Sequence, residues 1–162
     1  MAFDAEAAEI AWAKKVLADN KTLPAILTTH RFLGLKGNID GPGKRQPPNE
    51  SESPPQVLWE QLIQPSPQIF MVLCGHYSGE AYLAKKNKAG QDVHLLLQDY
   101  QNDDNGGNGW LRIYQFLPET GTIEVQTYSP HLKEFKKGPK SQFHFDFDFK
   151  RLGPAPALRA AG

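Results

Sequence analysis

Residues 69–76 read Ile69-Phe70-Met71-Val72-Leu73-Cys74-Gly75-His76, an apolar run that ends in glycine and histidine. A short continuous apolar run between turn-forming residues predicts a strand that is buried on both faces. Ala25-Ile26-Leu27-Thr28-Thr29-His30 shows the same pattern earlier in the chain. Because a loop and a helix separate the two runs, we expect the two strands to be parallel. The sequence therefore indicates an α/β fold with a histidine at the same end of two strands.

Two helices are expected around these strands. Residues 4–19 space apolar side chains helically, and residues 55–63 open with proline and do the same. The predicted buried stripe of the first helix consists of Ala8, Trp12, Val16 and Leu17. Residues 34–55 are rich in Gly, Pro, Asn and Ser and predict a long exposed loop. We expect Trp12, Trp59 and Trp110 in the core, with a place beside a cleft as the alternative for Trp110.

From Gly79 onward, alternating apolar and polar segments predict an antiparallel meander. Its expected strands are residues 82–86, 93–100, 111–117, 123–128 and 143–149. The last of these alternates four phenylalanines with polar residues, so one face should be apolar. Residues 103–109 predict a hairpin loop, because their acidic and glycine residues lack the register of a calcium loop. We expect one domain over residues 1–152 and a disordered tail over residues 153–162.

Composition limits the functional classes. The chain has 162 residues, of which 40% are hydrophobic and 22% charged, as is typical of globular proteins. Basic and acidic residues number 18 each, so net charge indicates neither a nucleic-acid nor a membrane partner. Cys74 lies in an apolar run and is expected to be a small buried hydrophobe. The N-terminus does not resemble a signal peptide, which leaves the localisation unknown.

His30 and His76 are the candidate metal ligands. Parallel strands present their carboxyl ends at one sheet edge, where α/β proteins bind ligands, and Gly75 is expected to permit a sharp turn that faces His76 toward a cleft. A neutral imidazole suits Zn, Mn or Fe. The alternative is a pair of surface or hydrogen-bonding histidines. No role is assigned to the other histidines, which are His94, His131 and His144.

Residues 26–30 and 70–76 resemble the last two motifs of calcineurin-like metallophosphoesterases. The similarity extends over about residues 8–149 and includes segments 93–101, 106–112 and 122–130, which are similar to the closing strands of bacterial members. The resemblance implies a four-layer α/β sandwich that holds a pair of divalent metals (Mn, Fe or Zn) and hydrolyses phosphate esters. His30 would match the histidine of the fourth motif and His76 the first histidine of G-H-x-H. Ser78 stands at the second histidine's position.

The D-x-H, G-D-x-x-D and G-N-H-D/E motifs of the family are not found in the sequence. Gly37-Asn38-Ile39-Asp40 lacks the histidine of G-N-H-D and is interpreted as loop. We therefore expect the C-terminal portion of a metal-dependent phosphoesterase, inactive alone, with no catalytic or substrate-binding residue assigned. The alternative function is a non-catalytic β-rich binding module that presents residues 103–109. Expected partners are a missing N-terminal half, supplied by a separate chain that pairs with the open sheet edge, or self-association.

Overall fold

The two histidine-ended runs form neighbouring parallel strands in the computed structural model, which describes residues 5–39 and 54–152. These strands are β1 (Ala25–Thr28) and β2 (Ile69–Cys74), and their parallel pairing confirms the prediction. The third parallel strand, β4 (Asp92–Asp99), pairs with β2, and β3 (Gly79–Lys86) pairs antiparallel with β4. The first sheet thus has the order β1-β2-β4-β3.

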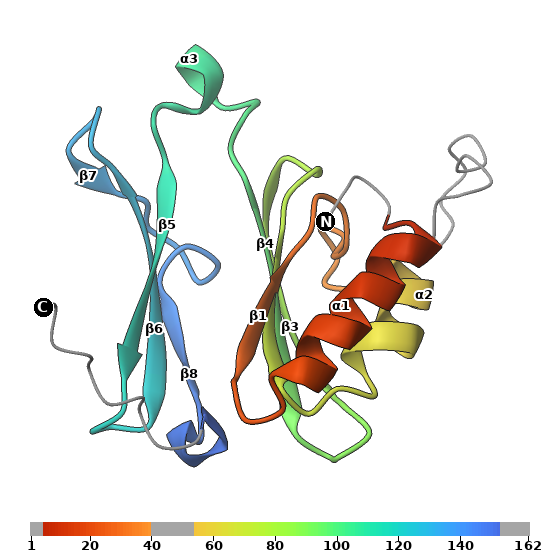
Figure 1. Cartoon of the computed structure of the whole chain (residues 1–162). Coiled ribbons are helices and arrows are strands. Elements are labelled where there is room, and N and C mark those ends of the chain that lie inside the picture. The colour runs from red at the N-terminus through yellow and green to blue at the C-terminus, as the bar shows by residue number, and fades with distance from the viewer. Residues whose placement is uncertain (1–4, 40–53, 153–162) are drawn as a thin grey trace, which may run out of the picture.

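A second sheet contains the remaining strands, so the prediction of a single meander was wrong. Its strands are β5 (Leu111–Leu117), β6 (Thr122–Ser129), β7 (Glu134–Phe135) and β8 (Phe143–Asp146), and β6 pairs with each of the others. Residues 103–109 are not a hairpin loop. They form a short helical turn, α3 (Asp104–Gly107), that carries the chain from the first sheet to the second (Figure 1). Left-handed backbone at Asn105, Gly106 and Asn108 makes this change of direction possible.

The two sheets lie opposite each other (Figure 1), and an apolar cluster with residues from both fills the space between them. Phe145 and Phe147 pack there with residues of β2, β4 and β6, while Phe143 and Phe149 are partly buried beside them. The phenylalanine-rich face predicted for residues 143–149 is therefore confirmed. The strand itself is shorter than predicted, because it ends at Asp146 and the 3-10 helix η2 (Phe149–Leu152) follows.

Helices cover the other face of the first sheet (Figure 1). They are α1 (Ala7–Asp19), α2 (Pro55–Leu58) and the π-helical turn η1 (Trp59–Ile63), which confirms both predicted helices. The buried stripe predicted for α1 was wrong except at Leu17, which is partly buried against the core. Ile10 and Ala13 face the core, whereas Trp12 and Val16 are 64% and 39% exposed. Helical spacing shows that a helix has apolar faces, but packing against η1 buries the face with Ile10 and Ala13 and not the predicted face.

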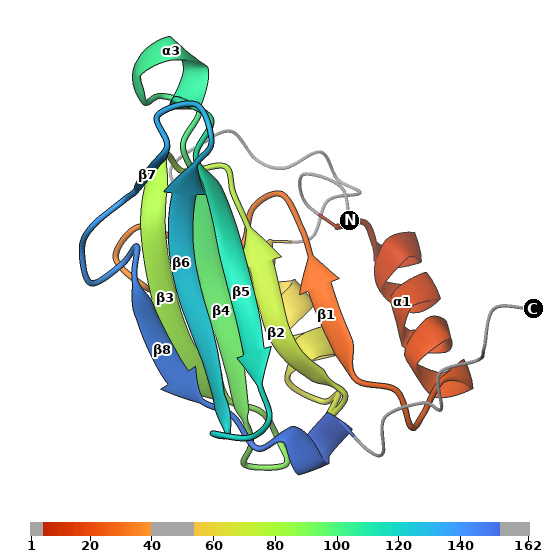
Figure 2. The same cartoon turned by 90° about the vertical axis from the view of Figure 1, so that its left-hand side faces the viewer.

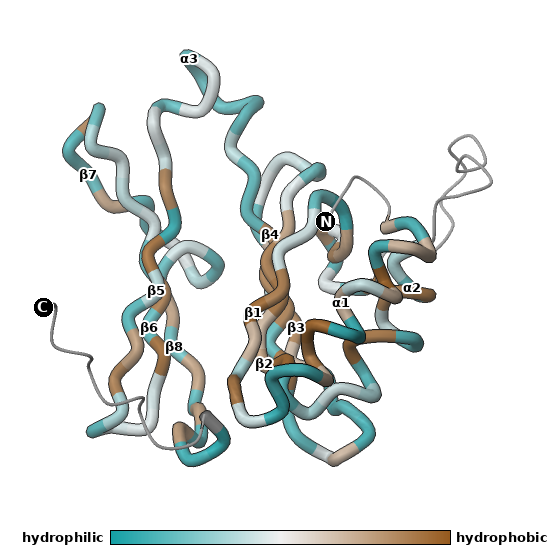
Figure 3. The backbone as a smooth tube through the Cα atoms, viewed as in Figure 1, coloured by the Kyte–Doolittle hydropathy of each residue, from teal (hydrophilic) through white to brown (hydrophobic). Residues whose placement is uncertain are grey.

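The residues that the structure describes thus form three layers: helices, the first sheet and the second sheet. Apolar residues concentrate in β1, β2 and β4 (Figure 3). The prediction that β1 is buried on both faces was wrong, because Ile26 is 45% exposed. In the view of Figure 2, the second sheet lies in front of β3 and β4 and leaves β1 uncovered.

Of the predicted loop, Gly34–Asn38 forms a turn closed by the hydrogen bond from Gly34 N–H to Asn38 C=O. Residues 40–53 and the predicted tail lie outside the described residues. Within the described ranges, no helix is long and apolar enough to cross a membrane.

Candidate metal site at the edge of the first sheet

His30 and His76 lie side by side just beyond the carboxyl ends of β1 and β2. The hydrogen bonding between these strands continues past their ends. Thr29 N–H donates to the Leu73 carbonyl at 3.0 Å, and Gly75 N–H donates to the His30 carbonyl at 2.9 Å. The two segments that carry the histidines are therefore tied together through their backbones.

The chain that follows His30 is anchored in the core. Phe32 and Leu33 are fully buried, and Leu33 N–H donates to Cys74 Sγ at 3.3 Å. Burial raises the pKa of the Cys74 thiol to about 11, which confirms its interpretation as a small buried hydrophobe. His30 is thus held between a strand and a buried anchor.

The two imidazoles are close enough to act together. His30 Nε2 and His76 Nδ1 are 3.3 Å apart, and the rings are tilted by 53°. One ring can donate a hydrogen bond to the other at this distance. The distance also suits two ligands of one ion, because metal–nitrogen bonds of about 2.0–2.1 Å at a tetrahedral angle place the nitrogens about 3.4 Å apart. That the two imidazoles share one sheet edge is confirmed, and their metal role stays a prediction.

The sharp turn at this edge lies on His76 rather than on Gly75. His76 has a φ of 73°, in the left-handed region that side chains rarely adopt, whereas Gly75 is not among the residues with positive φ. The expectation that Gly75 provides the turn was therefore wrong. A non-glycine residue in this conformation costs about 1–2 kcal/mol. Such strain is typical of functional sites, where the side chain is needed in that position.

We expect a His76→Gly variant to be about 1 kcal/mol more stable than a His76→Ala variant. Both remove the imidazole, but only alanine keeps the backbone strain. Urea unfolding followed by circular dichroism measures the difference. At His144, in the extended strand β8, the same two substitutions should rank in the opposite order, because glycine weakens a strand. A His76→Gly variant that is less stable than His76→Ala would show that the backbone of residue 76 is not strained.

The two residues that follow His76 also make close contacts or are buried. The Tyr77 ring meets the His76 imidazole edge-on at 4.7 Å between centroids. Ser78 Oγ is buried and has no hydrogen-bond partner among the described residues. An unpaired buried hydroxyl costs about 1–3 kcal/mol. A bound group, or chain beyond the described ranges, that forms a hydrogen bond with Ser78 Oγ would recover this energy.

Asp99 belongs to the same edge and was missed by the sequence analysis. It ends β4, the third parallel strand, and its Oδ2 would lie 3.6 Å from a Cβ atom placed on Gly75. Its Oδ1 accepts a hydrogen bond from Gln101 N–H at 3.1 Å. A carboxylate therefore borders the residue that precedes His76. The sequence placed Asp99 near the end of a predicted strand, but this strand, β4, was expected in an antiparallel meander and not parallel to β2.

The histidine pair is not joined by a third ligand within the described ranges. No group of three or more His, Cys, Asp or Glu side chains placed to hold a metal occurs in residues 5–39 and 54–152. Divalent transition metals in proteins usually take four or more ligands. The two histidines alone are half the number of ligands that such a metal requires.

A separate buried polar cluster joins the two sheets. The Glu80 carboxylate of β3 forms an ion pair with Arg112 of β5, and both side chains are less than 10% exposed. Glu80 also accepts hydrogen bonds from Tyr100 at 2.7 Å, Thr127 at 3.2 Å and Ser141 at 2.6 Å. Burial would raise the pKa of Glu80, but the hydrogen bonds from Ser141 and Tyr100 and the charge of Arg112 lower it below its ordinary value. No pattern in the sequence indicated this cluster.

The short basic patch at residues 133–137 contributes to local structure. Lys136 forms an ion pair with Asp103 at 2.9 Å. Its ammonium group also lies over the rings of Tyr100 and Trp110, at 4.7 and 5.6 Å. Lys136 thereby fixes α3 against the second sheet.

These features define a mixed α/β domain of facing sheets with a histidine pair at the carboxyl edge of the first. No family model matches the chain. The chain is similar to the uncharacterized protein YvnB of Bacillus subtilis strain 168, with 31% identity over 156 aligned residues. The match covers 88% of this chain and 11% of the relative, so the chain spans a small part of that protein's length.

Proposed function

We propose that this chain contributes His30 and His76 to a divalent-metal site of a calcineurin-like metallophosphoesterase, which hydrolyses phosphate esters when complete. The observation that carries the proposal is the 3.3 Å separation of His30 Nε2 and His76 Nδ1 beyond two parallel strands. The strained backbone of His76 and the motif resemblance of residues 26–30 and 70–76 support it. In this proposal a further helical layer covers the outer face of the second sheet and completes a four-layer sandwich.

The residues present fit one ion of the proposed metal pair. His30 and His76 would hold it through nitrogens whose spacing matches a shared ion, and His30 is open to solvent. Ser78 is a poor ligand for a transition metal, although its buried Oγ, which has no hydrogen-bond partner among the described residues, could contact a bound group. The carboxylates of the absent motifs would come from polypeptide outside this sequence. A bound Mn, Fe or Zn ion supplies positive charge that stabilises the phosphoryl oxygens during hydrolysis.

We expect the chain alone to bind Zn²⁺ and Mn²⁺ with dissociation constants weaker than about 1 µM, because two ligands do not complete a site. His30→Ala and His76→Ala should each abolish the remaining binding. Isothermal titration calorimetry measures both effects. His144→Ala, at an exposed position of β8, is the matched control and should leave binding unchanged. Phosphatase activity on aryl phosphates should be near background in all four proteins.

The outcomes separate the parts of this proposal. Binding that is unaffected by both histidine variants would remove the metal role. Submicromolar binding that is lost in both variants would show that the chain completes its own site, and that the half-site interpretation is wrong.

A non-catalytic β-rich binding module is the second candidate. It is favoured by the observation that the described residues place no third ligand beside the histidine pair. In that case the hydrogen bond between His30 and His76 is structural, and calorimetry detects no histidine-dependent metal binding.

A further inference from the structure

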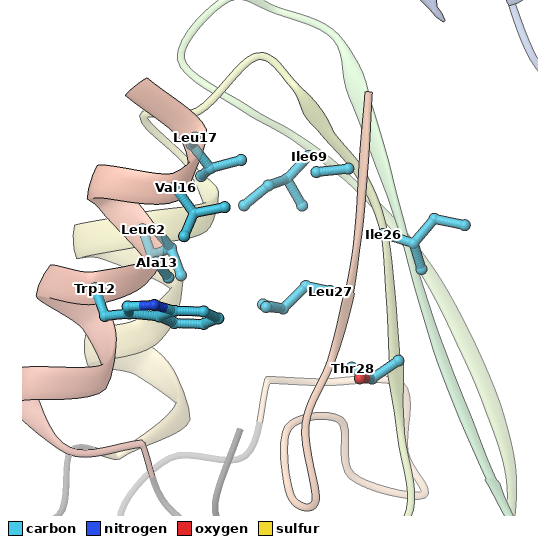
Figure 4. Close-up of a pocket in the computed structure, with 10 residues that line it drawn as sticks. Trp12, Ala13, Val16, Leu17, Ile26, Leu27, Thr28, Leu62 and Ile69 are labelled. Carbon is cyan, nitrogen blue, oxygen red and sulfur yellow. The ribbon is translucent and has the colours of Figure 1, made fainter. Parts of the chain in front are cut away.

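The segments that carry His30 and His76 pack against different layers of the molecule. β1 leads into His30 and packs against the helices, because Leu27 points from β1 toward α1 (Figure 4) and lies beside the apolar core. The loop that carries His76 leads into β3, which the second sheet covers (Figure 2). Contacts between β3 and the second sheet therefore bear on the position of His76.

The connection between β2 and β3 is short and is held at both ends. It runs from Gly75 to Gly79, and its disfavoured backbone conformation at His76, with a φ of 73°, persists only where the surrounding structure holds it. At the first end, Gly75 N–H donates to the His30 carbonyl at 2.9 Å. At the second end, a Cβ atom on Gly79 would lie 2.9 Å from Leu35 Cδ2, so this backbone packs directly against the turn that follows His30.

Glu80, the next residue, fixes the second end to the opposite sheet. Its Oε1 accepts hydrogen bonds from Arg112, Tyr100 and Thr127. Its Oε2 accepts one from Ser141 at 2.6 Å. Arg112 and Thr127 lie on β5 and β6, so these contacts cross from one sheet to the other. The side chains of Glu80 and Arg112 are 9% and 3% exposed, so water competes little for these bonds.

We propose that Glu80 and Arg112 are positioning residues for His76: the buried pair fixes the start of β3 and thereby holds the His76 imidazole beside His30. Desolvation offsets much of the attraction within a buried ion pair, so apolar replacement of both partners can preserve stability. Removal of the whole pair therefore separates positioning from stability. The positioning stands on the contacts described above, whereas its use in metal binding rests on the proposed function.

NMR of the whole, isotopically labelled chain without metal tests the inference. Glu80→Leu combined with Arg112→Met removes the pair without leaving a buried charge, so this double variant is expected to fold. The NOE between the amide and α hydrogens of His76 is strong at positive φ, because the two hydrogens are then close together. It should weaken in the double variant as the backbone of His76 relaxes.

Hydrogen exchange provides a second readout. In the double variant, exchange of the Gly75 N–H should quicken by about tenfold or more relative to exchange of the Ala25 N–H. Ala25 donates to the Gln68 carbonyl at the opposite end of β1, so it serves as the reference within the same protein. A general loss of stability would quicken both amides, whereas loss of positioning quickens Gly75 alone.

Two further variants keep the test decisive. Ser141→Ala removes one hydrogen bond to Glu80 and should quicken Gly75 exchange by about fivefold, which decides the test if the double variant does not fold. Tyr82→Phe is the matched control, because it removes a hydroxyl of β3 that shares a hydrogen bond of 3.0 Å with His94. This control should retain both wild-type signals. Unchanged signals in Ser141→Ala and the double variant, or equal changes in Tyr82→Phe, would overturn the inference.

Zn²⁺ titration of the same samples keeps the inference apart from the proposed function. Weaker Zn²⁺ binding in the double variant than in Tyr82→Phe, together with a loosened His76 loop, supports both. A loosened loop in the double variant, with no Zn²⁺-induced shift of the His30 or His76 signals in the wild type, supports the positioning and overturns the metal role.

Discussion

An Arg112→Met variant should lose about 3–5 kcal/mol of unfolding free energy, because it leaves the Glu80 carboxylate buried between the sheets without a charge partner. Methionine preserves most of the side-chain length, so the loss reports the charge rather than a large cavity. Urea denaturation measures the change. The surface pair of Lys86 and Asp92 is the matched control, since Lys86 is 64% exposed. Lys86→Met should cost less than about 1 kcal/mol.

A double variant separates the ion pair from the packing. When Glu80→Leu is combined with Arg112→Met, the total loss should be smaller than the sum of the two single losses, because no unpaired charge remains buried. Purely additive losses would show that the two residues contribute independently.

The lowered pKa of Glu80 also predicts how the unfolding free energy depends on pH. A carboxyl group with a lowered folded-state pKa stabilises above its unfolded pKa, and this contribution is lost as the pH falls through the folded pKa.

The protein should lose about 3 kcal/mol of unfolding free energy when the pH falls from 6.5 to 4, because of the lowered pKa of His94. Burial lowers the pKa of His94 to about 4 and outweighs the attraction of Asp92. The ring stacks on Phe145 at 4.0 Å and shares a hydrogen bond of 3.0 Å with Tyr82 Oη. Between these pH values the unfolded chain binds a proton at this position and the folded chain does not. Acidification therefore favours unfolding.

A comparison of His94→Leu with His144→Leu tests whether His94 causes this loss of stability at low pH. His94→Leu should flatten the dependence of unfolding free energy on pH in this range, whereas His144→Leu, at an exposed position, should retain it. Urea denaturation at half-unit pH intervals provides the measurement. An unchanged pH profile in His94→Leu would assign the acid sensitivity to other groups.

The sequence by itself predicted the features that depend on local pattern. The apolar run of residues 69–74 became β2 with the same bounds, and the alternating phenylalanines of residues 143–149 face the apolar layer between the two sheets. His30 and His76 were expected at one sheet edge and lie 3.3 Å apart there. These predictions were possible because strand pleating and a helical crossover relate neighbouring residues to faces and directions without knowledge of the remaining fold.

Only the tertiary structure decided which elements become neighbours. β4 lies beside β2 as a third parallel strand, which brings Asp99 to the histidine edge, and the chain then crosses to a second sheet through α3. The Glu80–Arg112 pair exists because that crossing places β3 opposite β5. The exposure of Trp12 likewise follows from the side on which α1 meets η1. Local periodicity specifies apolar faces, but the order of strands and the partner of each face depend on contacts between residues far apart in the chain.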